Sequence, residues 1–384
     1  MSDSMTDHLE NSENGTALRR GWTTGACATA ATKAALTALI SGEFPDPVVI
    51  TLPKGQQPAF ALTHESLQKD HAEASIIKDA GDDPDVTHGA LITVKVAFGE
   101  AGCGIVFRAG DGVGTVTRPG LPIGVGEPAI NPVPRALMTQ VVNSLAAAHD
   151  LQPDVEITIS VRNGEKLAAK TWNPRLGIVG GLSILGTTGI VVPFSCSAWI
   201  HSIHRGVDVC IAEGQTHVAG STGSTSERVV QGLYDLPDFA MLDMGDFVGG
   251  MLKYLRKNPV ARVTIGGGFA KISKLAQGAM DLHSGRSQVD FEWMAERLQR
   301  LGADASLIER AHTANTALEI LQEAQKVGLD IAGLIASEAQ AKALALLGDG
   351  PIALDIIVID RAGTLLAQTE PLTFEQHSAG SPSG

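Results

Sequence analysis

Apolar residues follow two different patterns along this chain of 384 residues. In the first half, apolar runs between turn residues predict strands at residues 48–52, 74–78, 90–97 and 155–161, and helices at 26–40 and 132–148. Thr23 or Thr24 can cap the first helix, and Gly42 can end it in a left-handed turn. Because strands and helices do not alternate regularly, we expect a mixed α+β domain over residues 18–180.

The pattern changes near residue 181. Strand, glycine-rich loop and helix follow one another four times, with strands at residues 182–185, 217–220, 239–244 and 262–265. This order predicts a Rossmann-like, doubly wound parallel sheet over residues 181–350. We expect further helices within that range and a hairpin at the C-terminal side. The helices are expected at residues 197–213, 247–257, 269–277, 290–301, 306–326 and 336–347, and the hairpin spans residues 351–372. The polar ends, residues 1–17 and 373–384, are expected to be disordered tails.

Composition restricts the partners of the chain. A net charge of −13 and only 4% aromatic residues argue against nucleic acid as the main partner. The four cysteines form no zinc or redox motif and suit a reducing cytosol. No apolar run is long enough for a membrane span, so we expect a cytoplasmic protein that does not bind a membrane. The chain could form a homo-oligomer.

Glycine and proline are concentrated in residues 110–135, which carry only two cations, Arg118 and Arg135. Glycine lets backbone N–H groups approach a ligand, and proline holds a loop in shape. Long structured loops of this kind are usually functional, so we favour a ligand-contacting loop. The alternative is a set of tight turns between strands.

Glycines and hydroxyl residues also stand at the predicted carboxyl ends of the parallel strands, where ligands of open α/β sheets bind. Helix starts favour an anion, and an acidic side chain can hold ribose hydroxyls, so we expect a nucleoside-containing cofactor there. Tight strand–helix turns would explain about half of these glycines equally well. The candidate cofactor residues are Gly186, Thr187, Thr188, Gly189, Thr222, Gly223, Ser224, Glu227, Asp243, Asp246, Gly266 and Gly267.

Four carboxylates and a histidine lie between Asp79 and His88. Asp82, Asp83 and Asp85 are our candidates for catalytic proton handling, and a solvated acidic turn is the equally weighted alternative. His201 and His204 share a helix face, but two ligands fall short of a metal site, so we expect no bound metal.

Taken together, these motifs resemble the CbiD family, the cobalt-precorrin-5B C(1)-methyltransferases of anaerobic cobalamin biosynthesis. The matching segments run in order from about Leu18 to Thr369. They are residues 21–31, 80–87, 110–135, 184–191, 221–227 and 266–276.

The resemblance implies transfer of a methyl group from S-adenosyl-L-methionine to C-1 of cobalt-precorrin-5B, giving cobalt-precorrin-6A. The cobalt then arrives inside the substrate. Substrate carboxylates would meet arginines, because a guanidinium matches a carboxylate. We expect the corrinoid to contact Thr23, Thr24, Gly112, Gly114, Arg118, Asn131 and Arg135.

Two other hypotheses belong to different classes. A corrinoid carrier without enzymatic activity would use the loop at residues 110–135 but would need no nucleoside pocket. A kinase or dehydrogenase on the same sheet would need a phosphate-loop lysine or a dinucleotide fingerprint, and the sequence has neither.

Overall fold

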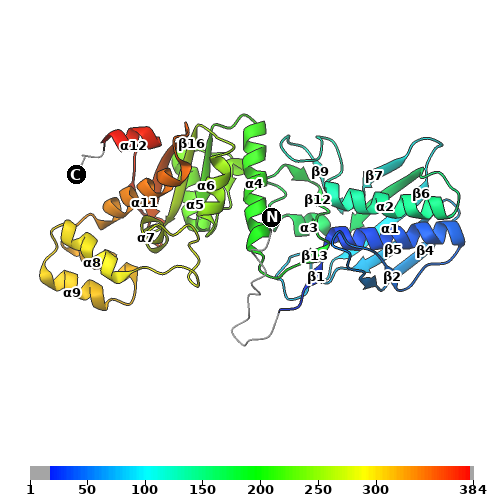
Figure 1. Cartoon of the computed structure of the whole chain (residues 1–384), viewed down its shortest axis with the longest axis horizontal. Coiled ribbons are helices and arrows are strands. Elements are labelled where there is room, and N and C mark those ends of the chain that lie inside the picture. The colour runs from blue at the N-terminus through cyan, green and yellow to red at the C-terminus, as the bar shows by residue number, and fades with distance from the viewer. Residues whose placement is uncertain (1–17, 381–384) are drawn as a thin grey trace, which may run out of the picture. The chain divides into compact units, whose positions relative to one another are not determined.

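The computed structural model describes residues 18–380, so the expected disorder of residues 1–17 and 381–384 lies outside the described residues. The chain is a mixed α/β protein with several sheets (Figure 1). It divides into an N-terminal unit that ends at Cys196 and a C-terminal unit that begins at Ser197. Each unit has its own hydrophobic core.

A five-stranded sheet forms the centre of the N-terminal unit. Its order is β4 (His64–Leu67), β5 (His71–Ile77), β6 (Leu91–Phe98), β10 (Val155–Val161) and β7 (Ile105–Ala109). Neighbouring strands are antiparallel except for β10 and β7, which are parallel. Inward-facing residues of β6 and β10 alternate with more exposed ones, as in a sheet with one covered face.

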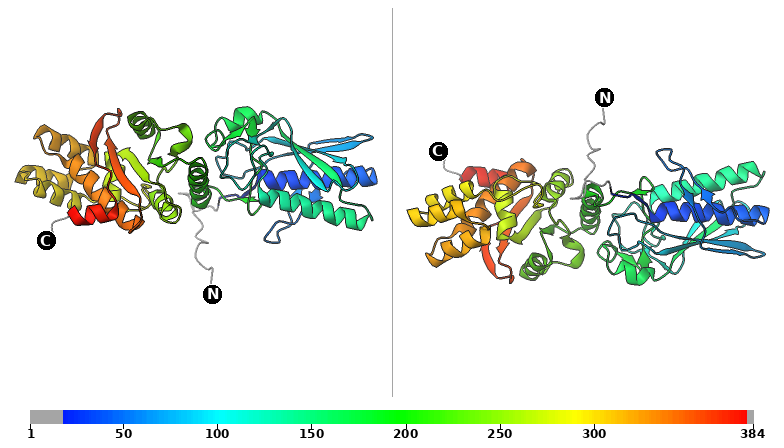
Figure 2. Two further views of the ribbon diagram at one scale, coloured as in Figure 1. Left: turned by 90° about the horizontal axis from the view of Figure 1, so that it is seen from above. Right: turned by 90° about the horizontal axis from the view of Figure 1, so that it is seen from below.

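Helix α1 (Thr24–Ser41) covers β5 and β6 and lies beside α2 (Pro132–Ala148). Figure 2 shows the two helices side by side in both views. The alanines and Cys27 of α1 are fully buried, and such small side chains allow close packing. Thr23 caps α1 by accepting from the Ala26 N–H, and Gly42 ends it with φ 87°, which confirms both predictions.

Short paired strands complete this unit, together with the small helix α3 (Gly164–Ala168). The pairs are β1 (Gly21–Trp22) with β13 (Ile190–Val191), β2 (Val48–Val49) with β3 (Ala59–Phe60), β8 (Gly112–Val113) with β12 (Gly181–Leu182), and β9 (Thr115–Val116) with β11 (Ile178–Val179). The prediction that residues 182–185 begin the parallel sheet was wrong. Leu182 ends β12, and residues 182–185 lie in the N-terminal unit, because Leu182 pairs with Val113 and Ile184 pairs with Ile130 of the glycine-rich segment.

A second five-stranded sheet forms the core of the C-terminal unit. Its order is β15 (Met241–Leu242), β14 (His217–Ser221), β16 (Arg262–Gly268), β17 (Ala353–Ile359) and β18 (Leu365–Gln368). The first four strands are parallel and β18 is antiparallel, so the expected C-terminal hairpin extends this sheet. The chain moves from β14 to one neighbour and then crosses to the other, so the strand order reverses beside β14.

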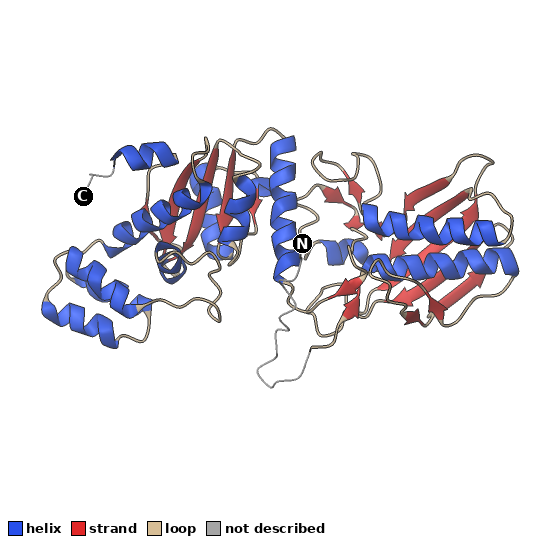
Figure 3. Ribbon diagram, viewed as in Figure 1, coloured by secondary structure: helices blue, strands red, loops and turns tan. Residues whose placement is uncertain are grey.

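Helices cover both faces of this sheet, as Figure 3 shows. A Cβ on Gly266 would meet α5 (Ser224–Tyr234), whereas a Cβ on Gly267 would meet α7 (Phe269–Ala276). Because consecutive strand residues face opposite sides, α5 and α7 lie on opposite faces. The remaining helices between β13 and β17 are α4 (Cys196–Ala212), α6 (Val248–Leu255), α8 (Phe291–Arg300), α9 (Ala305–Thr313), α10 (Ala317–Lys326) and α11 (Ile331–Leu347), with the 3-10 helix η1 (Asp238–Ala240) before β15.

Two helical segments differ from expectation. The single helix predicted over residues 306–326 is interrupted, because Thr316 is extended and caps α10 by accepting from the Glu319 N–H. Part of the expected C-terminal tail is helical and forms α12 (Phe374–Gly380). Thr373 and Gln376 exchange hydrogen bonds at its start, a reciprocal cap that the sequence analysis overlooked.

Candidate functional site

A cavity of about 750 Å³ lies in the C-terminal unit, where three parallel strands end. Its walls include the segments directly after β14, β16 and β17, which are Thr222–Ser226, Gly268–Lys271 and Ile359–Arg361. In open parallel sheets this edge is where ligands bind, and the strand order reverses here beside β14. The volume is that of a small-molecule pocket.

The walls of the cavity combine hydroxyl, amide and apolar groups. Helices α5, α7 and α10 all begin in it, and the first turn of a helix carries backbone N–H groups that have no partner within the helix. In α10 the Glu319 N–H is already bonded to Thr316. Phe269, Phe291 and Leu318 supply apolar surface. The remaining polar lining includes Ser284, Ser287, Gln288, Asn315 and Thr316.

Positive charge predominates in the lining. Lys271, Lys274 and Arg361 line the cavity, whereas Asp360 is the single carboxylate of the lining. This excess occurs in a chain with net charge −13. Asp360 accepts from the Thr364 N–H, so its charge is partly committed to the β17–β18 turn. The cavity therefore suits a ligand with at least one negative group.

Lys274 is buried, with 6% of its surface exposed. Burial lowers the pKa of its ammonium from the ordinary 10.5, and the neighbouring Lys271 lowers it further. The Nζ atoms of Lys271 and Lys274 each donate to the Leu282 carbonyl at 3.0 Å, and Lys271 also pairs with Asp246.

Three predicted cofactor residues line this cavity, namely Thr222, Gly223 and Ser224. Asp246 reaches it indirectly through Lys271, and Glu227 lies in the first turn of α5. Asp243 follows β15, where its carbonyl accepts from the Trp199 indole N–H. Gly266 and Gly267 are buried in β16, where larger residues would strike Val230, Ile272 or Thr222.

The other predicted cofactor loop, Gly186, Thr187, Thr188 and Gly189, is in the N-terminal unit and does not join this cavity. A Cβ on Gly186 would lie 2.3 Å from Thr23 Oγ1, and one on Gly189 would lie 2.5 Å from a Leu52 methyl. These glycines allow the loop to pack against the start of α1. Thr188 turns the loop by bonding both backbone groups of Ile190.

The glycines of residues 110–135 are needed for contacts between backbones. Gly112 has φ 75°, and a Cβ there would lie 2.1 Å from the Val161 carbonyl oxygen. A Cβ on Gly114 would lie 2.4 Å from Ile178. These close approaches are to the protein itself, so they explain the glycines without a ligand.

The two cations of that segment also have protein partners. Arg135 donates to the carbonyls of Ile130 and Pro128 at 2.8 and 3.1 Å and pairs with Glu127 at 2.8 Å. The Arg118 stem packs against Gly177. Asn131 precedes α2 without capping it through its side chain, and its N–H donates to Ile184.

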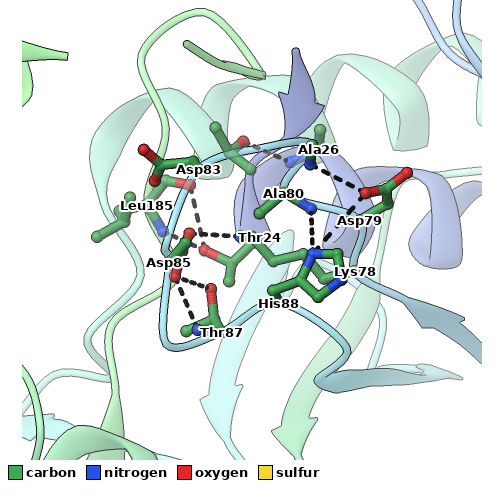
Figure 4. Close-up of polar contacts among 12 residues, drawn as sticks. Thr24, Ala26, Lys78, Asp79, Ala80, Asp83, Asp85, Thr87, His88 and Leu185 are labelled. Carbon is green, nitrogen blue, oxygen red and sulfur yellow. Dashed lines mark hydrogen bonds and ion pairs between the residues drawn. The ribbon is translucent and has the colours of Figure 1, made fainter. Parts of the chain in front are cut away.

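The acidic segment forms a tightly bonded loop beside the start of α1 (Figure 4). Asp79 pairs with Arg19, which lowers the pKa of that carboxyl to about 2. Asp82 accepts from the Arg19 N–H at 2.6 Å and Asp83 from the Phe194 N–H at 2.8 Å. Asp79 and Asp82 thus tie the loop to Arg19, and Asp83 ties it to Phe194.

Asp85 holds a buried cation. Its carboxylate pairs with Lys78, whose side chain is 1% exposed, and accepts from the N–H and hydroxyl of Thr87. Burial would raise the pKa of Asp85, but the Lys78 ammonium and the Thr87 donors outweigh it and hold the pKa below 3.8. Thr24, in the same region, exchanges hydrogen bonds with Leu185 (Figure 4).

Another buried polar cluster lies in the C-terminal sheet, toward the amino-terminal ends of its parallel strands. Asp355 is fully buried and accepts from Tyr234, Arg262 and Thr264, and Thr264 in turn bonds His217. Burial and Arg262 lower the pKa of His217 to about 4. Because each of these side chains is hydrogen-bonded within the cluster and the cavity is at the other strand ends, we assign the cluster to stabilising the sheet.

Sequence reasoning missed Lys271, Lys274, Asn315, Thr316 and Arg361. Two signals were present. The lysines recur three residues apart soon after the glycine-rich stretch Gly266–Gly268. Thr316 precedes a helix with Glu319 at the third position, which is a capping pattern.

Among residues 18–380, the structure has no group of three or more potential metal ligands. His204 stacks on Tyr254 instead, with ring centres 4.0 Å apart. The same described residues contain no helix with the length and hydropathy needed to cross a bilayer.

Fold and cavity together define an α/β protein with a cavity of small-molecule size at the carboxyl ends of parallel strands. The CbiD sequence profile matches residues 11–193, and that of the CbiD C-terminal domain matches residues 281–370. The chain is 62% identical over 368 residues to the cobalt-precorrin-5B C(1)-methyltransferase of Brucella canis, covering 96% of this chain and all of the relative. The chain belongs to the CbiD family.

A second relative and a solved structure also match. The Brucella anthropi protein of the same name is 63% identical over 351 residues, covering 91% of this chain and 95% of its own. A solved structure, the cobalamin biosynthesis protein CbiD of Archaeoglobus fulgidus, is 26% identical and covers 75% of this chain and 86% of its own, with a TM-score of 0.38.

Proposed function

We propose that this protein methylates C-1 of cobalt-precorrin-5B to give cobalt-precorrin-6A, with S-adenosyl-L-methionine as the methyl donor. The identity of 62% over the whole length of relatives with that name carries the proposal. A methyltransferase needs a donor and an acceptor, and the cobalt enters with the corrinoid acceptor.

The cavity of the C-terminal unit is our proposed donor site. Its size, the hydroxyl and amide groups for a nucleoside, and the excess of cations for a carboxylate all suit S-adenosyl-L-methionine. The parallel strands and the reversal beside β14 support a Rossmann-like reading of this unit. Thr222, Gly223 and Ser224 are the predicted cofactor residues retained in this proposal.

When bound, the donor supplies a methyl group on a positively charged sulfur, ready for displacement by a nucleophilic carbon. The chain's contribution is to position the donor and to keep water out, which can account for much of the rate. Helix starts and lysines would hold its carboxylate, and Phe269 and Phe291 would shield it from solvent.

Several expectations stay predictions. They are corrinoid contacts by Thr23, Thr24, Asn131 and the segment at residues 110–135, proton handling by Asp82, Asp83 or Asp85, a cytoplasmic location and a homo-oligomer. Arg135 and Asp85 already form ion pairs within the protein. To contact the substrate, each would have to break its ion pair or bind the substrate while keeping it.

The decisive experiment is an anaerobic incubation with cobalt-precorrin-5B and a trideuteriomethyl donor. We expect the corrinoid to gain one labelled methyl group, read by mass spectrometry, with no gain when the donor is omitted. Calorimetry with S-adenosylhomocysteine runs in parallel. Retention of unreacted corrinoid without binding of S-adenosylhomocysteine would instead identify a carrier.

A further inference from the structure

Two lysines meet at one carbonyl in the wall of the cavity. Lys271 and Lys274 are one helical turn apart on α7, and their Nζ atoms both lie 3.0 Å from the Leu282 oxygen. Two ammonium groups that share one acceptor are close neighbours and repel each other. Such an arrangement is unfavourable unless negative charge is supplied nearby.

The protein supplies only part of that charge. Asp246 pairs with Lys271, and the next carboxylate, Asp281, pairs with Arg286 at 2.6 Å. Within the described chain, Lys274 has no carboxylate partner of its own, although it is buried. An ammonium has three donors, and one hydrogen bond to Leu282 leaves two. The Lys274 ammonium can therefore offer two hydrogen-bond donors and its positive charge to a ligand.

We propose that Lys271 and Lys274 form a carboxylate-binding subsite that holds the amino-acid end of the methyl donor in the cavity. This inference rests on the proposed function. It also orients the ligand, because the polar side chains of Ser287, Gln288, Asn315 and Thr316 are then left for the nucleoside end.

The size of the cavity favours the methyl donor, and not the corrinoid, as the molecule whose carboxylate binds there. A volume of about 750 Å³ is in the range of pockets that enclose one small molecule. A corrinoid macrocycle is larger than the donor and carries several acid side chains, which is more negative charge than one pair of lysines can hold. The donor carries a single carboxylate, which matches one pair of lysines.

The test measures whether these lysines recognise a carboxylate. Calorimetry compares S-adenosylhomocysteine with its decarboxylated analogue on the full chain and on Lys274→Met and Lys271→Met variants. The original chain should prefer the carboxylate by about 10- to 100-fold, the range for a hydrogen bond between charged groups. Lys274→Met should lose most of that preference, and Lys271→Met a smaller part.

Two controls separate recognition from folding. Lys253→Met removes an exposed lysine of the same unit that does not line the cavity, and it should leave the preference unchanged. Thermal unfolding of every variant checks the fold. Lys271→Met stays informative if Lys274→Met unfolds, because the Lys271 side chain is 32% exposed.

The calorimetry distinguishes a wrong carboxylate subsite from a wrong donor site. Equal preference for the carboxylate in the original chain and both folded variants would overturn the subsite. The same would follow if the variants lost affinity for the corrinoid but not for S-adenosylhomocysteine. An original chain that binds no S-adenosylhomocysteine would overturn both the donor site and the subsite.

Discussion

Two glycine-rich regions of this molecule look alike in sequence and do different things in the structure. In the N-terminal unit, the glycines of residues 110–135 let backbone segments cross, and Arg135 bonds the carbonyls of its own loop. In the C-terminal unit, the segments after β14 and β16 surround a cavity whose cations exceed its carboxylates. The two regions differ in what their internal contacts leave over. Only the C-terminal cavity keeps empty space and positive charge that a ligand could use.

Glycine shows the same difference position by position. A Cβ on Gly112 would overlap the Val161 carbonyl oxygen, whereas a Cβ on Gly223 would meet no atom within 4 Å. A glycine that no neighbour requires, at a helix start in a cavity wall, is the stronger indication of a ligand.

The largest effect should come from testing this pair of glycines. We expect Gly112→Ala to destabilise the protein by about 4 kcal/mol or more, because the methyl group strikes backbone and φ is 75°. Gly223→Ala should change stability by less than about 1 kcal/mol, since the site is extended and open.

Urea unfolding measures both stabilities, and calorimetry measures S-adenosylhomocysteine binding to Gly223→Ala. That affinity should fall, because the new methyl group occupies cavity space. The comparison fails if Gly112→Ala is as stable as the original chain, or if Gly223→Ala unfolds the protein.

A smaller loss of stability is expected at the acidic loop. Asp85→Asn leaves the Lys78 ammonium buried without a counter-charge, so we expect a loss of about 3 kcal/mol. Because the folded-state pKa of Asp85 is below 3.8, the stability it contributes is present above that pH and is lost as pH falls through the lowered pKa. The variant should lack that acid-dependent component.

Chemical unfolding between neutral and acid pH tests this, with the Lys78→Met and Asp85→Asn double variant as the control that removes both charges. The double variant should recover part of the loss. Methyl transfer per folded molecule should survive in Asp85→Asn if the residue is structural. Its collapse in a stable variant would support the catalytic role predicted from the sequence.

Much of the fold could be predicted because its signals are local. The bounds of α2 and β10 match the predicted ranges, since Asn131 with Pro132 marks the helix start and alternation marks the strand. The loop after β14 was predicted as a cofactor loop because parallel strands place their ends together.

What the sequence could not show depends on distant partners. The role of Lys274 depends on Leu282, which lies in a segment without regular structure. The break before α10 was missed although Thr316 and Glu319 form a capping pattern, because the helical pattern continues on both sides of them. Residues 182–185 look like a strand of either unit, and only their pairing with the glycine-rich segment decides.

The smallest expected effects concern one arginine from each region. Arg361 is exposed at the end of β17, lines the cavity and makes no ion pair within the described chain, so Arg361→Met should leave stability unchanged. It should weaken binding of S-adenosylhomocysteine only about two- to fivefold, as an exposed cation does, and added salt should remove the difference.

Arg135→Met should affect stability rather than binding. It should lower stability by about 1 to 2 kcal/mol, because the Ile130 carbonyl loses its Arg135 donor and Glu127 loses its ion pair, while the Pro128 carbonyl keeps the Ile130 N–H. It should leave binding of S-adenosylhomocysteine unchanged. Titration calorimetry at low and high salt, with urea unfolding of both variants, measures the two effects together. If Arg135→Met weakened donor binding and Arg361→Met did not, the assignment of the donor to the C-terminal cavity would be wrong.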